Sequence, residues 1–174
     1  MTTAIRDAKI DDLAALARVH VDAWRAAYIG MMPDAFLASL DPAERAARWR
    51  ARFDEWGRDK RLFAAFDARG ELVGMAGVGP ARGDARERGE LYMINVAPPA
   101  WGTGVAVALL AHATRTLTEL GHREAILWVL RQNARARRFY RREGWKQEGD
   151  RRDTISENGF TFDVDELLYT RALC

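Results

Sequence analysis

A glycine-rich segment between an expected strand and an expected helix is the part of the sequence best suited to chemistry. It reads Val96-Ala97-Pro98-Pro99-Ala100-Trp101-Gly102-Thr103-Gly104-Val105-Ala106. The first N–H groups of a helix lack a partner within the helix, and the helix dipole makes their surroundings positive. Gly102 and Gly104, with the small Ala106, would let a phosphate approach these groups closely. The segment is therefore a candidate phosphate-binding loop.

Other interpretations of this loop fit less well. A nucleoside triphosphate loop needs Lys and then Ser or Thr after its second glycine, whereas Val105-Ala106 follows here. A dinucleotide fingerprint needs a third glycine or alanine, where this chain has Val107, and an acidic residue at the end of the next strand, which ends at Leu130. A glycine-rich turn that only links a strand to a helix is not excluded by the spacing alone.

A second candidate group lies on a short helix expected from Asn133 to Glu143. Tyr140 carries a phenol with an ordinary pKa of about 10, so it is protonated at neutral pH and can donate a proton. The alternative is an aromatic side chain that packs at helical spacing from Ala136. Asn133 suits contact with a ligand, and it equally suits a helix N-cap.

Hydrophobic periodicity predicts the elements that must position these residues. Helices are expected over about 11–28, 34–40, 42–56, 102–120 and 133–143. Strands are expected at 4–8, 61–66, 71–78, 90–96, 125–130, 145–148 and 161–171, with a polar loop joining the last two. A strand–helix–strand passage at 90–130 therefore sits between hairpins. That order predicts the α/β class, with a mixed sheet and helices on both faces.

Composition narrows the function classes. The length of 174 residues suits a single domain, 1–174, and a formal net charge of +2 gives no reason to expect nucleic acid. The sole cysteine is the terminal Cys174, and no Cys or His spacing suggests a metal site. The longest nearly apolar run, 105–111, is too short for a bilayer, and the N-terminus shows no apolar leader. We expect a cytoplasmic protein without membrane contact.

The loop resembles motif A of the GNAT family of N-acetyltransferases, in which Arg/Gln-x-x-Gly-x-Gly/Ala follows an aliphatic strand ending in Val-x-Pro. The second family segment, Asn-x-x-Ala-x-x-Phe-Tyr-x-x-x-Gly-Phe, resembles Asn133-Ala134-Arg135-Ala136-Arg137-Arg138-Phe139-Tyr140-Arg141-Arg142-Glu143-Gly144-Trp145. The stretch 18–33 is similar to the start of many bacterial members, so the resemblance covers nearly the whole chain. One departure is Trp101, where the motif has Arg or Gln; its indole N–H can still donate one hydrogen bond.

The resemblance implies a fold and a cofactor. The sheet would be mostly antiparallel, with a V-shaped splay between the strand ending at Val96 and the strand 125–130. Acetyl-CoA would enter the splay and pair with backbone groups of Ile94 and Val96, with Thr103 as a helper at the pyrophosphate. The arginines of 135–142 are expected to form a solvated helix face that could meet the 3′-phosphate. The expected cofactor-binding residues are Ile94, Asn95, Val96, Trp101, Gly102, Thr103, Gly104, Val105, Ala106, Val107 and Asn133.

The resemblance also implies the chemistry. Tyr140 would protonate the coenzyme A thiolate, and Glu90 would take the proton of the amine, made more basic by burial beside a hydrophobic strand. Glu90 could instead be a solvated residue at the strand start, with a water chain as the base. Trp24, Tyr28 and Tyr92 are the expected acceptor-binding residues, together with the loops 30–33 and 150–160.

The expected reaction is direct transfer in a ternary complex to a primary amine, favoured to be that of a small molecule. A protein lysine or N-terminal amine is the alternative acceptor, and an acyl-CoA-binding module without turnover is the alternative class. A nucleotide-dependent switch is not expected. A homodimer that pairs through the final strands is plausible by the resemblance.

Overall fold

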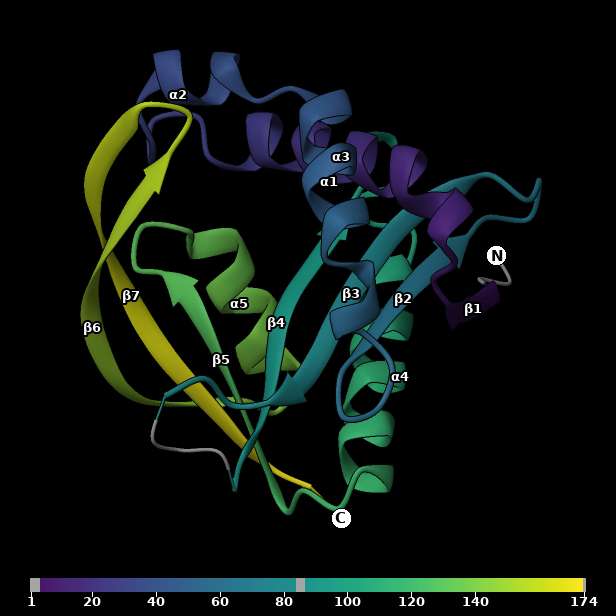
Figure 1. The fold of residues 1–174 in the computed structure, drawn as a ribbon. Coiled ribbons are helices and arrows are strands. Elements are labelled where there is room, and N and C mark those ends of the chain that lie inside the picture. The colour runs from purple at the N-terminus through teal and green to yellow at the C-terminus, as the bar shows by residue number, and fades with distance from the viewer. Residues whose placement is uncertain (1–3, 84–86, 174) are drawn as a thin grey trace.

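The computed structural model describes residues 4–83 and 87–173 (Figure 1). Within those residues the strands form one seven-stranded sheet in the order β1-β2-β3-β4-β5-β7-β6. Neighbouring strands are antiparallel except β4 and β5, which are parallel. The strands are β1 (Ala4–Asp7), β2 (Arg61–Phe66), β3 (Leu72–Pro80), β4 (Gly89–Val96), β5 (Glu124–Leu130), β6 (Lys146–Glu157) and β7 (Phe160–Ala172). The predicted mixed, mostly antiparallel sheet is confirmed, and Cys174 lies outside the described residues.

Helices cover both faces of this sheet, as predicted (Figure 1). They are α1 (Leu13–Ala27), α2 (Asp34–Ser39), α3 (Pro42–Ala51), α4 (Val105–Glu119) and α5 (Ala134–Arg142), with short 3-10 turns η1 (Ile10–Asp12), η2 (Phe53–Glu55) and η3 (Pro98–Ala100). On one face, α4 and α5 enclose a core with inward residues such as Phe63, Leu109 and Trp145. On the other, α1, α2 and α3 pack over residues such as Leu16 and Met75.

The sheet divides between β4 and β5. These strands pair only at Gly89 with Ala125 and at Glu90 with Ile126, after which β4 follows β3 and β5 follows β7. A register shift on β3 pairs Gly77 with Met93 and Val78 with Leu91, so Tyr92 is the extra residue of a β-bulge. A bulge bends its strand, which suits the divergence. The expected V-shaped splay is present, and α5 lies across it (Figure 1).

The prediction of a polar loop between the last two strands is wrong. Strands β6 and β7 form a long hairpin whose turn is Asn158-Gly159, with φ of +53° and +76°. Asn-Gly with both φ positive matches the twist of a two-residue hairpin. The antiparallel pair predicted at 145–148 and 161–171 is present, but β6 extends to Glu157. The prediction of this strand is too short because β6 is an edge strand with mostly exposed side chains, held by cross-strand polar contacts such as Thr154 Oγ1 to Asp163 (2.8 Å), so it lacks the apolar alternation that marks a half-buried strand.

Candidate functional site

Two glycines shape the loop between β4 and α4. Gly102 and Gly104 have φ of +79° and +93°, a left-handed conformation that other residues adopt only under strain. Helix α4 therefore begins at Val105, later than the periodicity predicted. The first helical bond runs from Ala108 N–H to the Gly104 carbonyl (3.0 Å). The N–H groups left without an intrahelical acceptor belong to Val105, Ala106 and Val107, and together with the positive end of the helix dipole they suit an anion.

Two side chains of the loop hold its shape. Trp101 Nε1 donates to the Val96 carbonyl (2.7 Å), and Thr103 Oγ1 donates to the Ala100 carbonyl (2.7 Å). Each donor hydrogen is thereby committed within the loop. Neither the indole N–H nor the Thr103 hydroxyl is then available to donate to a phosphate, so the donors that remain are backbone groups.

The free edge of β4 presents its backbone to the splay at two residues. Ala97 N–H bonds the Val73 carbonyl (2.8 Å), and antiparallel pairs alternate between bonded and non-bonded. Asn95 therefore bonds toward β3, whereas Ile94 and Val96 turn their N–H and C=O groups the other way, into the splay. The Val96 carbonyl is occupied by Trp101. The Val96 N–H and both backbone groups of Ile94 remain for an extended ligand.

Asn95 is directed away from the splay. Its side-chain Nδ2 lies 3.1 Å from His20 Nδ1 on α1, and both residues are buried. His20 also contacts the rings of Trp24 and Trp49, at centroid distances of 4.8 and 5.2 Å. Burial, with help from nearby arginines, lowers the pKa of His20 to about 3, so this histidine is neutral and not a proton carrier. The structure uses Asn95 to join β4 to α1.

Helix α5 brings Asn133 and Tyr140 to the splay. Asn133 is buried and its Oδ1 accepts from Ala136 N–H (3.0 Å), the N-cap arrangement. Tyr140 is half-buried against Trp145 and Tyr169, with ring centroids 6.2 and 6.4 Å away. Its hydroxyl makes no hydrogen bond to the described residues. Burial, and to a smaller extent Tyr28, raises the pKa of Tyr140, so the phenol stays protonated throughout the physiological range.

Tyr28 contributes electrostatically to the raised pKa of Tyr140, although the helices that carry the two residues cover opposite faces of the sheet. At the splay no strand separates those faces. Tyr28 packs edge-on against Trp24 (5.2 Å), and burial with the nearby Glu166 raises the pKa of Tyr28 to about 12. The two expected acceptor residues of α1 therefore lie together at the open side of the splay.

Glu90 is buried at the closed end of the splay, and Arg82 occupies its carboxylate. The Arg82 backbone N–H donates to Oε2 (2.8 Å), and its guanidinium donates to Oε1, with Nε at 3.0 Å. Glu90 is thus a buried carboxylate held in an ion pair with Arg82. Tyr92 donates its hydroxyl to the Pro80 carbonyl (2.6 Å), and the Arg82 guanidinium lies over its ring (5.5 Å).

Further charged and aromatic residues, which the sequence pattern does not single out, lie around Glu166 and Arg151. Arg151 of β6 pairs with Glu166 (Nη2 to Oε2, 2.6 Å) and lies over the Trp128 ring (4.0 Å). Glu166 also interacts electrostatically with Arg82 and Tyr28. Arg82, Arg151 and Trp128 carry no local motif that marks them in the sequence.

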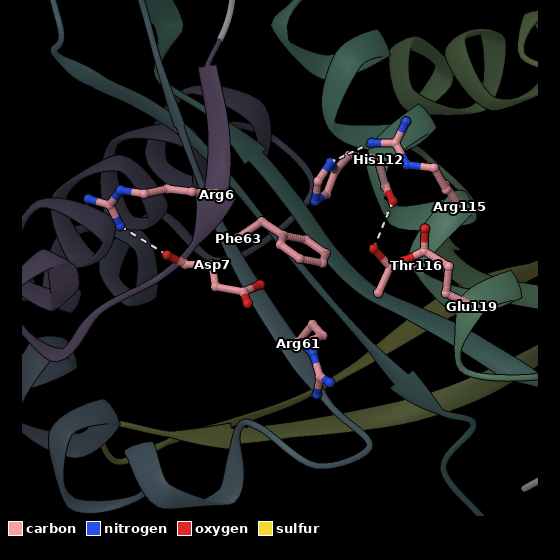
Figure 2. Close-up of a pocket in the computed structure, with 8 residues that line it drawn as sticks. All are labelled: Arg6, Asp7, Arg61, Phe63, His112, Arg115, Thr116 and Glu119. Atoms are coloured by element: carbon pink, nitrogen blue, oxygen red, sulfur yellow. Dashed lines mark hydrogen bonds between the residues drawn. The ribbon is translucent and has the colours of Figure 1, made fainter.

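Two hollows lie elsewhere on α4. One, of about 400 Å³, sits between β1, β2 and the far half of α4 (Figure 2). Its lining mixes acids and bases: Arg6, Asp7, Arg61, Phe63, His112, Arg115, Thr116 and Glu119. The other, of about 650 Å³, runs along α4 beside the end of α5. Neither is lined by Gly102, Gly104 or Tyr140, so the loop and the splay remain the candidate site.

The described ranges, 4–83 and 87–173, lack two kinds of feature. They contain no cluster of His, Cys, Asp and Glu side chains fit to hold a metal ion. No helix in them has both the length and the apolar character to cross a membrane.

Comparison with known proteins gives a consistent family. A model of the acetyltransferase (GNAT) family matches residues 14–145. YuaI of Bacillus subtilis, an uncharacterized N-acetyltransferase, is 35% identical over 130 residues, which are 74% of this chain and 72% of the relative. A mycothiol acetyltransferase of Propionibacterium freudenreichii is 32% identical over 135 residues, which are 78% of this chain but only 40% of that longer protein.

Solved structures agree in fold. A phosphinothricin acetyltransferase of Sinorhizobium meliloti, in complex with AcCoA, has a TM-score of 0.72 at 25% identity, over 99% of this chain and 89% of that one. PaiA N-acetyltransferase of Thermoplasma acidophilum, in complex with coenzyme A, has a TM-score of 0.76 at 21% identity, over 99% of both chains. The second likeness concerns the fold alone.

Proposed function

The chain belongs to the acetyltransferase (GNAT) family, and from that premise we propose that it acetylates the primary amine of a small molecule. The protein is an acyltransferase whose acyl donor is acetyl-CoA. The relatives and solved structures carry names as different as mycothiol acetyltransferase and phosphinothricin acetyltransferase, so membership of the family does not identify the amine. The nature of the acceptor and the roles of individual residues are the proposal.

On the donor side, we assign the pyrophosphate to the N–H groups at the start of α4 and the pantetheine to the free edge of β4. The exposed N–H of Ile94 or Val96 would polarise the thioester carbonyl, because each points into the splay. Asn133, whose Oδ1 is used as the helix cap, has its Nδ2 left for the cofactor. Tyr140 lies beyond, where the leaving sulfur would emerge.

The observation that carries the small-molecule assignment is the closure of the acceptor side. The β6–β7 hairpin is fastened to the N-terminal helices: the Phe36 ring meets those of Phe160 and Phe162, at 5.9 and 5.0 Å. Asn158 donates to the Ser39 carbonyl (3.2 Å), and Arg45 and Arg48 both pair with Glu157 (2.7 and 2.8 Å). A side closed in this way favours a compact acceptor over an extended peptide.

The proposed reaction is a direct transfer. The neutral amine attacks the thioester carbon, the C–N bond forms and the C–S bond breaks. Tyr140 gives its proton to the coenzyme A thiolate. The amine proton passes to Glu90 through water, because Glu90 and Ile94 are separated by about 13 Å at the rise of a strand. Direct transfer needs no covalent acyl-enzyme.

An amine panel tests the acceptor assignment. Thiol release from acetyl-CoA would be measured with monoamines, polyamines, amino acids and aminoglycosides, and with peptides bearing a lysine or a free N-terminus. We expect the best small amine to exceed the best peptide at least about a hundredfold in kcat/KM, or about 2.7 kcal/mol. A peptide as the best acceptor would contradict the small-molecule assignment. Tight acetyl-CoA binding without thiol release from any amine would favour the binding module instead.

Glu90→Gln tests the proposed base. We expect kcat at neutral pH to fall about 10²-fold, within the usual range for general-base catalysis, and to recover as the pH approaches the pKa of the acceptor amine, because the amine then loses its proton without help. The readout is the pH profile of kcat with the best acceptor. Glu124→Gln is the matched control, since Glu124, at the start of β5, pairs with Arg88 (3.0 Å), which precedes β4, and should tolerate the change. An equal loss at every pH would assign Glu90 a structural role.

A further inference from the structure

Arg135 lies against the phosphate loop although it comes from a different element. It belongs to the first turn of α5, and its guanidinium carbon is 3.5 Å from the centroid of the Trp101 ring. Trp101 immediately precedes Gly102, the first glycine of the loop. A guanidinium over the face of an indole is a favourable cation–π contact, and the flat stack restricts its position.

Trp101 occupies the motif position where the resemblance gives Arg or Gln. Its side chain cannot offer a phosphate the hydrogen-bond donors that either of those residues carries. Its one donor is committed to the Val96 carbonyl (2.7 Å), and it carries no charge. The loop is nevertheless closed, because that bond ties its start to the end of β4. What the position lacks is a side-chain donor that is free to bind a phosphate.

Arg135 can supply this donor, and it also carries a positive charge. No carboxylate of the described residues pairs with it, whereas Arg131 pairs with Asp150 (2.8 Å) and Arg142 pairs with Glu143 (3.0 Å). Partial burial lowers the pKa of Arg135, but a guanidinium stays charged at any physiological pH. With one face on the indole, its N–H groups at the ring edge remain free to bind oxygen.

We propose that Trp101 and Arg135 together replace the usual first residue of the motif: Trp101 closes the loop, and Arg135, held flat on its ring, binds the pyrophosphate of acetyl-CoA. The cation therefore reaches the phosphate from α5, the helix that also carries Asn133 and Tyr140. Cofactor binding would then help to fix the helix that carries the proposed acid.

Arg135→Ala tests this with three acyl donors: acetyl-CoA, acetyl-dephospho-CoA, which lacks the 3′-phosphate, and S-acetylpantetheine, which lacks the pyrophosphate. We expect KM to rise about tenfold to thirtyfold for the first two and to stay unchanged for the third. Arg123→Ala is the control, since Arg123 is an exposed arginine just before β5, beyond the end of α4 that lies away from the loop, and it should change none of them. A loss that disappears with acetyl-dephospho-CoA would assign Arg135 to the 3′-phosphate, and an equal loss in both variants would reduce it to general surface charge; either overturns the proposal.

Two further variants separate the partners. Arg135→Lys keeps the charge but loses the flat stack, so we expect an intermediate KM. The double variant Trp101→Arg with Arg135→Ala returns the cation to the motif position and should recover most of the affinity lost in Arg135→Ala. No recovery, in a protein whose melting temperature without cofactor matches that of Arg135→Ala, would contradict the exchange of roles.

Discussion

Tyr140→Phe is expected to lower kcat about a hundredfold while changing the affinity for acetyl-CoA by less than about twofold. Proton donation to a leaving group contributes about 10²–10⁴ to a rate, and the low end applies because a thiolate is a fair leaving group without help. Phenylalanine keeps the ring contacts with Trp145 and Tyr169, so the fold should be undisturbed. Steady-state rates and isothermal titration with acetyl-CoA provide the two numbers.

Tyr169→Phe is the matched control. Tyr169 belongs to the same aromatic cluster, but it is fully buried and its hydroxyl has no partner among the described residues. Removing that hydroxyl should leave kcat unchanged. Because burial raises the pKa of Tyr140, the wild-type rate should not decline between about pH 8 and 10 through loss of this proton. Equal rates for wild type and Tyr140→Phe would remove Tyr140 from the mechanism.

The part of the site built from backbone could be predicted from the sequence. Gly102 and Gly104 indicate a loop with left-handed backbone, because few other residues tolerate that conformation. The strand before the loop and the helix after it determine where the N–H groups of the loop point. The alternation of an antiparallel ladder then directs Ile94 and Val96 into the splay. These features depend on local geometry, which short segments of sequence carry.

The side-chain environment could not be predicted, because it depends on contacts between distant segments. Nothing near Glu90 in the sequence indicates that Arg82 would fold back onto its carboxylate. The pairing of Asn95 with His20 requires knowing how α1 lies on β4. The Asn158-Gly159 dipeptide is a local signal for a hairpin turn, but the charged edge strand beside it lacks the apolar alternation that marks a strand.

Gly104→Gln is expected to weaken acetyl-CoA binding about a hundredfold. The residue is the N-cap of α4 and has φ of +93°, so a side chain there both strains the loop and projects where the pyrophosphate would lie. Losing two hydrogen bonds to a charged phosphate costs about 3 kcal/mol, which is roughly two powers of ten in affinity. Isothermal titration with acetyl-CoA measures the loss.

Gly121→Gln separates the two causes, because Gly121 follows the other end of the same helix with φ of +92° and, like Gly104, has no atom within 4 Å of an added Cβ. Both variants should lose about 1–2 kcal/mol of stability through the same backbone strain, which a domain of ordinary stability survives. Acetyl-CoA should then raise the melting temperature of wild type and Gly121→Gln alike, and leave Gly104→Gln nearly unshifted. If both variants lost the cofactor equally, the effect would belong to the helix as a whole, and the loop would not be the phosphate site.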